Sequence, residues 1–223
     1  ADDGSCYYSK EVDYHFGANL ISYYILPDTL NNIDTYPIVD LVNNYYNDNI
    51  TGMLNENSAM VVYDGNIYGS LLEVNRKSGY WLTLQYDQSN SFAGFKTLSN
   101  MEYVLHQGNN LISFPSDQYF SIDGVIPDDL EGVIYKVLGE NNAALYIDDA
   151  WIGSLTFLEG FKGYWFVSSE DVDFSFALTE ESLSRGQQII VQRYVYGYEY
   201  TPSLPKRLTV RHKLKCHDQF HPI

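Results

Sequence analysis

Short apolar runs that end at turn-forming residues recur along this chain and predict β-strands over most of its length. Residues 19–26 form one such run, which stops at Pro27. Residues 110–114 form another, which stops at Pro115. Proline cannot donate to a β-ladder, so both prolines mark strand ends.

The clearest local pattern is a β-hairpin. Residues 59–63 and 67–71 are strand-like and flank the turn Asp64-Gly65, and Asp-Gly supplies the positive φ angles that tight hairpin turns require. A second hairpin is predicted over residues 143–155, with Asp148-Asp149 at its turn.

Strands that enter through a glycine follow each hairpin, at residues 79–84 and 163–167. Helix is scarce. Residues 126–132 combine a proline, acids and a closing glycine, which predicts one short helical turn, and residues 40–48 hold the corresponding segment. The sequence therefore predicts an all-β protein.

The same unit occurs twice. The octapeptide from His15 to Ser22 returns from His106 to Ser113, a shift of 91 residues (106 − 15). A later block returns at a shift of 84 residues (163 − 79): Glu56-Asn57, Asp64, Gly69-Ser70-Leu71 and Gly79-Tyr80-Trp81 match Glu140-Asn141, Asp148, Gly153-Ser154-Leu155 and Gly163-Tyr164-Trp165. The first copy thus has seven extra residues (91 − 84) between the two blocks. Self-similarity of this kind indicates modular architecture.

We therefore expect two tandem, homologous β-sandwich or β-barrel modules of about five or six short strands each. The predicted boundaries are an N-terminal linker over residues 1–12, modules over residues 13–97 and 98–184, and a strand-forming C-terminal tail over residues 185–223.

Charge sets the tail apart from the rest of the chain. The chain carries a net charge of −16. Residues 1–184 hold 6 basic and 27 acidic residues, whereas residues 185–223 hold 7 basic and 2 acidic ones. The tail either folds back onto the second module or adds to a sheet edge of another copy, guided by opposite charge. The candidate assembly residues are Cys6, Cys216, Tyr194, Tyr196, Tyr198, Arg211, Lys213 and Lys215.

The composition also bounds localisation and partners. A strongly acidic chain repels nucleic acid, and no apolar run approaches the ~20 residues that span a bilayer, so we expect neither nucleic-acid binding nor membrane insertion. The charge suits an extracellular or cell-surface protein, and the opening without methionine suggests a piece of a longer protein. The only two cysteines, Cys6 and Cys216, bridge the termini, link neighbouring copies or stay free.

The repeated set Asn-Leu-Ile-Ser, Gly-Ser-Leu and Gly-Tyr-Trp resembles tandem repeats of large secreted and surface-anchored proteins of environmental bacteria. The resemblance covers about residues 13–93 and 104–177. It implies β-rich extracellular modules and supplies no catalytic residues.

The candidate chemistry of the repeats is limited. His15 and His106 occupy equivalent positions, where a repeated structural role at a strand entry is favoured over ligand binding. No phosphate-binding loop, nucleophile elbow or zinc-protease motif occurs, so we do not expect an enzyme.

No cofactor is expected, although calcium is an option for the carboxylates of the turns: Glu56, Asp64, Asp128-Asp129 and Asp148-Asp149. The tail cluster of His212, Cys216, His217 and His221 could bind zinc, but a plain tail is favoured because the spacing lacks two clean ligand pairs.

Aromatic residues leave carbohydrate binding open. Trp151 and Tyr164 are the candidate sugar-stacking residues, and Asn49 begins a glycosylation acceptor pattern. The alternation along a strand predicts that one residue of each Tyr-Trp pair is buried and the other exposed.

The favoured function is a non-enzymatic, extracellular structural subunit of a surface fibre or filament, which assembles with copies of itself by strand addition of its terminal segments. The alternatives are a carbohydrate-binding or adhesive module, with polysaccharide as partner, and a viral fibre or decoration protein.

Overall fold

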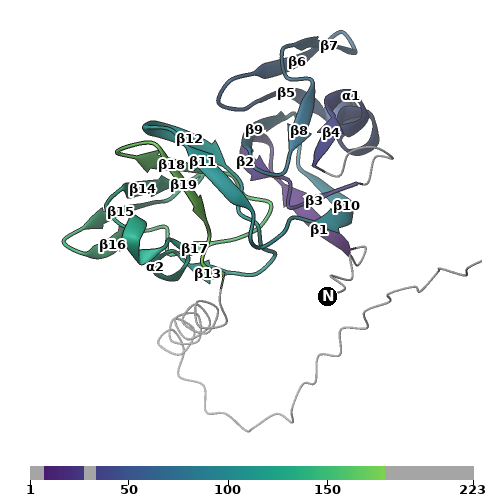
Figure 1. The fold of residues 1–223 in the computed structure, drawn as a ribbon. Helices are drawn as coiled ribbons and strands as arrows, with labels where there is room; N and C mark the ends of the chain where they lie inside the picture. Colours follow the sequence, from purple (N-terminus) through teal and green to yellow (C-terminus); the bar gives the residue numbers. More distant parts are fainter. Residues whose placement is uncertain (1–7, 28–33, 179–223) are drawn as a thin grey trace, which may run out of the picture.

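The computed structural model describes residues 8–27 and 34–178, which form two β-rich lobes, one for each repeat (Figure 1). The protein is all-β, as the sequence predicts, and its sheets are open rather than closed barrels. The cysteines and the candidate assembly residues of the tail lie outside the described residues.

A five-stranded antiparallel sheet forms the body of the first module, in the order β2-β9-β5-β6-β7. Its strands are β2 (Gly17–Ser22), β9 (Gly79–Leu84), β5 (Ile50–Leu54), β6 (Ala59–Tyr63) and β7 (Asn66–Gly69). The second module repeats this order as β12-β18-β14-β15-β16. These strands are β12 (Gly108–Ile112), β18 (Tyr164–Ser168), β14 (Ile134–Leu138), β15 (Ala143–Ile147) and β16 (Ala150–Gly153).

Smaller sheets close the far side of each core. In the first module β10 (Gln88–Lys96) pairs with β1 (Tyr8–Tyr14) and β3 (Ile25–Leu26), and β4 (Thr35–Pro37) pairs with β8 (Glu73–Asn75). The second module matches them with β11 (Glu102–Leu105) on β19 (Val172–Ser175) and β13 (Phe120–Ser121) on β17 (Phe157–Leu158).

The chain enters the first module earlier than the predicted boundary. Residues 8–12, predicted as part of a linker, belong to β1, whose residues pair in register with β10 from Tyr8 opposite Gly94 to Tyr14 opposite Gln88. Tyr14 is the only fully buried residue of β1, and exposed positions such as Ser9 and Lys10 are polar. The strand therefore lacks the apolar pattern by which a strand is recognised in a sequence.

Helical turns are short, as expected. Residues 38–49 form a four-residue α-helix (α1, Ile38–Leu41), a π-turn (Val42–Tyr46) and a 3₁₀ turn (Asn47–Asn49). In the second module the predicted turn is the 3₁₀ segment Asp128–Leu130, and a further turn, α2 (Ile122–Val125), precedes it.

Both predicted hairpins are present. Asp64 and Gly65 have φ angles of 49° and 71°, which is the pair of positive φ values that a type I′ turn requires. The second hairpin reaches the same geometry without glycine, because Asp148 and Asp149 have φ angles of 51° and 59°.

Each lobe has its own hydrophobic core. Tyrosine contributes more to the first core than its usual half-exposed role suggests, because Tyr14, Tyr23, Tyr46 and Tyr80 are all buried there. The hydroxyls of Tyr23 and Tyr46 satisfy each other at 3.0 Å, which compensates their burial. Burial in this apolar cluster raises the pKa of both tyrosines well above the ordinary value.

Candidate functional site

The two repeats meet through the outer edges of their five-stranded sheets. β2 is the terminal strand of its sheet, and the second module covers it: Ser22 N–H donates to the Phe161 carbonyl at 3.0 Å, and Gly163 N–H donates to the Leu20 carbonyl at 3.1 Å. β12 is covered in the same way by the first module, where Ser113 N–H donates to the Lys77 carbonyl at 2.9 Å. Unpaired strand edges attract other chains, and here each repeat protects the edge of the other.

A glutamate from each repeat completes the protection of the other repeat's edge strand. Glu140 accepts the backbone N–H of Leu20 at 3.0 Å through one carboxylate oxygen and contacts the His15 ring at 2.5 Å through the other. Glu56 does the same in the opposite direction, with the Leu111 N–H at 3.2 Å and the His106 ring.

These contacts are reciprocal. His15 and His106 are equivalent at a shift of 91, and Glu56 and Glu140 are equivalent at a shift of 84, yet each histidine binds the glutamate of the other copy. Two copies that exchange the same contacts form an isologous, pseudo-twofold interface. Such an interface is closed, so once the two modules have paired, the same surfaces cannot bind a further module.

The hydrogen bonds of both histidines require a protonated ring. His15 Nδ1 lies 2.7 Å from the Phe16 carbonyl, and Nε2 faces the Glu140 carboxylate. Both partners are acceptors, so both ring nitrogens must donate, and only the imidazolium has two N–H groups. The same holds for His106, between the Gln107 carbonyl and Glu56.

The surroundings of the histidines favour this protonated form. The backbone hydrogen bond to Phe16, followed by the bond to Glu140, raises the pKa of His15. The bond to Glu56, followed by that to Gln107, raises the pKa of His106.

The glycine of each Gly-Tyr-Trp motif gives the modules room to approach. A Cβ at Gly163 would lie 2.6 Å from the Ile21 carbonyl oxygen, and one at Gly79 would lie 2.8 Å from a methyl carbon of Leu111. Real Cβ atoms do not approach this closely, so a side chain at either position would push the edge strand of the other module away.

The contact made by Phe161 is not symmetric. Phe161, from the second module, is buried in the core of the first, where its ring centroid lies 6.0 Å from that of Tyr24 and 5.8 Å from that of Phe92. The equivalent residue of the first module is Lys77, which is exposed. Phe161 therefore anchors the second module in the first, and Lys77 does not do the same in the other direction.

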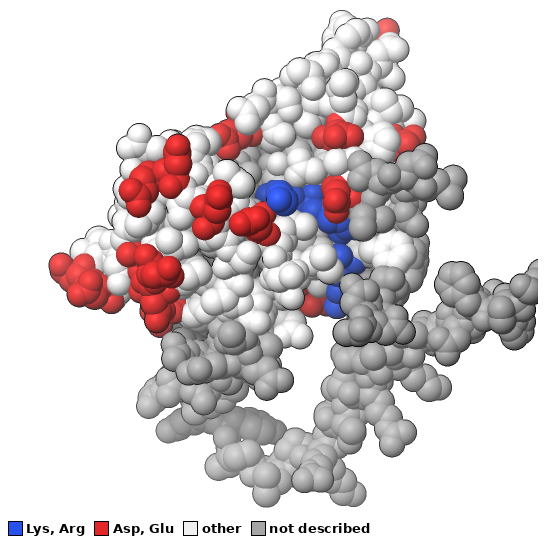
Figure 2. Space-filling model, viewed as in Figure 1, with Lys and Arg blue, Asp and Glu red and all other residues white. Residues whose placement is uncertain are grey.

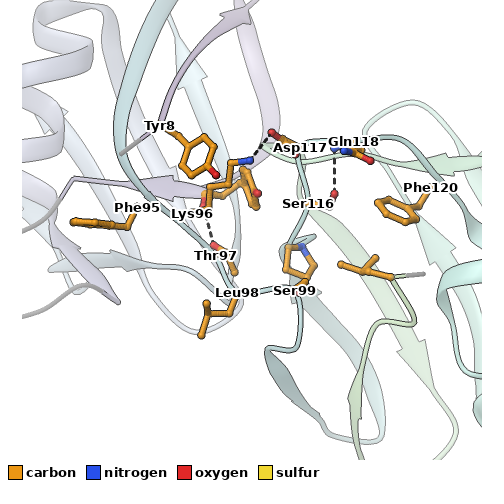
Figure 3. A pocket seen from close by; sticks show the side chains of 13 residues that line it. Tyr8, Phe95, Lys96, Thr97, Leu98, Ser99, Ser116, Asp117, Gln118 and Phe120 are labelled. Atoms are coloured by element: carbon orange, nitrogen blue, oxygen red, sulfur yellow. Dashed lines mark hydrogen bonds and ion pairs between the residues drawn. The ribbon is translucent and has the colours of Figure 1, made fainter. Parts of the chain in front are cut away.

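A pocket of about 450 Å³ also lies where the modules meet (Figure 3). Lys96 is its central charged residue: its ammonium lies 3.1 Å from the Asp117 carboxylate and 3.7 Å from the centroid of the Tyr8 ring. Asp117 belongs to the second module, so this ion pair links the lobes. Both contacts already compensate the charge of the Lys96 ammonium. The side chain is therefore better suited to holding the two modules together than to binding an anionic ligand.

The charge distribution agrees with this assignment. Figure 2 shows that the visible Lys and Arg residues gather near the middle of this face, whereas Asp and Glu residues are spread over the whole face and also lie beside the basic ones. At the junction, the Lys96–Asp117 pair brings opposite charges of the two lobes together.

The residues predicted to contact carbohydrate do not form a sugar platform. Tyr164 is only 4% exposed, and its hydroxyl accepts the Glu159 N–H, so this prediction is wrong. Trp151 lies on the core side of its hairpin, packs against the second core, and donates from its indole N–H to Glu131 at 2.9 Å. The alternation within Gly-Tyr-Trp is as expected, since Tyr80 and Tyr164 are buried and the tryptophans are more exposed.

The predicted glycosylation site is also wrong for the folded protein. Asn49 is 1% exposed, and its amide oxygen accepts the backbone N–H groups of Gln85 and Tyr86 while its nitrogen donates to the Tyr86 carbonyl. A glycan on that nitrogen would break these bonds. Asn49 instead fixes the turn that follows β9.

The described residues bring together no group of three or more His, Cys, Asp or Glu side chains that could hold a metal ion. The carboxylates of the turns considered for calcium are thus not gathered into one site, and Glu56 serves the interface instead. The histidines and cysteine of the tail lie outside the described residues. Within residues 8–27 and 34–178, no helix is long and apolar enough to cross a membrane.

The sequence shows that the two histidines and the two glutamates are repeated, but it does not show that each histidine contacts the glutamate of the other copy. The His and the Glu that recur in both copies are the sequence signal for this pairing. The role of Phe161 has no signal in the sequence, since this residue departs from the repeat.

Comparison of the chain with protein-family models, with curated proteins and with solved structures finds no match.

Proposed function

We propose that this protein is a non-enzymatic structural subunit that acts outside the cell, as a building block of a surface fibre or filament. The observation that carries the proposal is the use of the repeated residues. The His, Leu-Ile-Ser, Glu and Gly positions that recur in both copies form the contacts between the copies. The repeated chemistry therefore serves to fix two modules into one unit.

A fixed pair of modules suits a load-bearing or spacing role. Separate linked domains move relative to one another unless their interface is substantial. Here edge-strand hydrogen bonds, two His–Glu pairs, the Lys96–Asp117 pair and the buried Phe161 ring all resist such motion. A viral fibre or decoration protein would use the same properties.

Polymerisation must use other parts of the chain, because the isologous interface is closed within one chain. The terminal segments outside the described residues are the joints expected from the sequence. The C-terminal one, residues 185–223, carries a net charge of +5 against −21 for residues 1–184. Opposite charge would guide it to the acidic body of a neighbouring copy.

Electron microscopy and sedimentation of the full chain test this proposal. The intact protein is expected to form filaments or discrete oligomers, and a variant lacking residues 186–223 is expected to stay a folded monomer. A truncated protein that still polymerises would exclude the tail as the joint. An intact protein that stays monomeric at all salt concentrations would contradict the proposed function itself.

A further inference from the structure

The outward face of the first five-stranded sheet is apolar. Strand pairing places Trp81 beside Leu54, and Val61 beside Tyr68, on the face opposite the core. Tyr63 shares this face, two residues after Val61. The exposed fractions are 44% for Leu54, 53% for Val61, 74% for Tyr63 and 53% for Tyr68, so nothing in the described structure covers them.

The second module has an apolar residue at each equivalent position of its own outward face. Those residues are Trp165, Leu138, Leu145, Ile147 and Ile152. Leu145, Ile147 and Ile152 are 38%, 47% and 55% exposed. We call these two sets of five residues the outer faces. Large apolar patches on a soluble protein mark interaction surfaces.

Charge is nearly absent from both outer faces. Among the paired positions on the outward sides of the two five-stranded sheets, Lys136 is the only charged residue. In a chain with 29 acidic residues, this leaves a surface on which two acidic molecules can meet without bringing carboxylates together.

Each outer face is continuous with the established interface. Leu20 pairs with Trp81, and Leu111 pairs with Trp165, so both leucines lie in the same rows of side chains. They are only 1% and 3% exposed, at the junction where each meets the glycine of the other module. The inner end of each row is thus already a module-to-module contact, while the outer end, on β6–β7 or β15–β16, reaches solvent at the far ends of the lobes (Figure 1).

We propose that the outer faces bind a second copy of this chain, with the outer face of one module packed on that of a neighbour. This rests on the proposed function and adds a second contact beside the terminal segments: both are needed to hold two copies together. Sheets pack face to face through interdigitating apolar side chains. Because a chain has one such face on each lobe, pairing the first module of one copy with the second module of the next gives a heterologous contact, which builds a filament or a ring according to its rotation.

The differences between the two faces argue against carbohydrate as the occupant. Sugar rings stack on aromatic faces. Tyr63 and Tyr68 of the first module are Ile147 and Ile152 in the second. Trp81 and Trp165 are present in both faces, but two of the three rings of the first face are aliphatic in the second. The apolar character common to all five positions is what a protein partner requires.

The test compares two double variants of the full chain. Val61→Glu with Leu145→Glu places a carboxylate on each outer face. The matched control, Val39→Glu with Val104→Glu, changes net charge equally at apolar positions that are 52% and 73% exposed but lie on α1 and β11. All four positions are exposed, so thermal unfolding should confirm that both variants fold.

Assembly is measured by sedimentation velocity and electron microscopy between about 0.1 and 1 M NaCl, where the Debye length falls from ~10 to ~3 Å. The wild type and the control are expected to assemble as salt screens their acidic charge. The outer-face variant is expected to need at least about tenfold more protein, since a buried, unpaired carboxylate opposes the contact.

Equal assembly of the outer-face variant and the control would overturn the inference and leave the proposed function standing. Failure of the wild type to assemble would defeat both. Retention of monomeric wild type on insoluble cellulose or chitin, lost in the outer-face variant but not in the control, would also overturn the inference, because it would assign the surface to carbohydrate.

Discussion

His15 and His106 show how little a residue's neighbours in sequence reveal about its role. Each ring has one bond near its own strand entry, to Phe16 or Gln107, as the sequence suggests. The other bond crosses to the opposite module, to Glu140 or Glu56. The charged groups around His15 are Glu140, Lys162 and, through the neighbouring backbone, Asp87, and those around His106 are Glu56 and Asp171.

We predict that these rings make stability depend on pH. Their folded pKa values are raised above the ordinary 6.5, so the stabilisation is complete below about pH 6.5 and is lost as pH rises through the folded values. The rings are more than half exposed, so each pair contributes at most about 1 kcal/mol. Urea unfolding between about pH 5.5 and 8.5 measures the effect.

The double variant His15→Gln with His106→Gln serves as the control for this pH dependence. Histidines of the tail remain in it, so the difference between wild type and variant isolates the two interface rings. A difference in stability that does not change over this pH range would contradict the assignment of imidazolium to both rings.

At the scale of elements, the two hairpins form equivalent turns from different residues. Gly65 takes a positive φ of 71° without strain, whereas Asp149 is held at 59°. Aspartate tolerates this region better than most residues but less well than glycine. The second hairpin is therefore the more strained of the two.

Exchange of these residues gives opposite predictions. Asp149→Gly is expected to stabilise the protein by about 0.5–1 kcal/mol, and Gly65→Asp to destabilise it by a similar amount, as measured by denaturant unfolding. Both residues are exposed, so packing should not mask the effect. Destabilisation by both substitutions would show that the turns are not governed by backbone conformation.

At the scale of the whole molecule, Phe161 joins the two lobes. It is 3% exposed and belongs to the core of the module that does not contain it in sequence. The Phe161 carbonyl also accepts the Ser22 N–H, so both its side chain and its backbone cross the junction. The lobes should consequently unfold together rather than one at a time.

Phe161→Ala is expected to cost roughly 3–5 kcal/mol and to separate one cooperative unfolding transition into two. Calorimetry measures both effects. Lys77→Ala, at the equivalent exposed position, should change stability by no more than about 0.5 kcal/mol. A single transition retained in Phe161→Ala would show that the edge-strand contacts alone couple the lobes.

Local features of the fold were predictable because they depend on neighbours in sequence. The hairpin over residues 59–71, the strand after Gly79 and the short helical turns all follow from turn residues and apolar runs. The polar strand β1 was not predictable, since only pairing with β10 defines it. The burial of Tyr164 and Asn49 was not predictable either, because burial is a tertiary property.

That this protein is all-β, acidic and built from two copies of one unit follows from its amino-acid sequence alone. The contacts that the copies make with each other are evident only in the folded molecule. The reciprocal bonds of His15 with Glu140 and of His106 with Glu56 join residues 125 and 50 positions apart, and no local pattern encodes such a distance. The physical reason is that edge strands must be covered, and in this chain each repeat supplies the cover for the other.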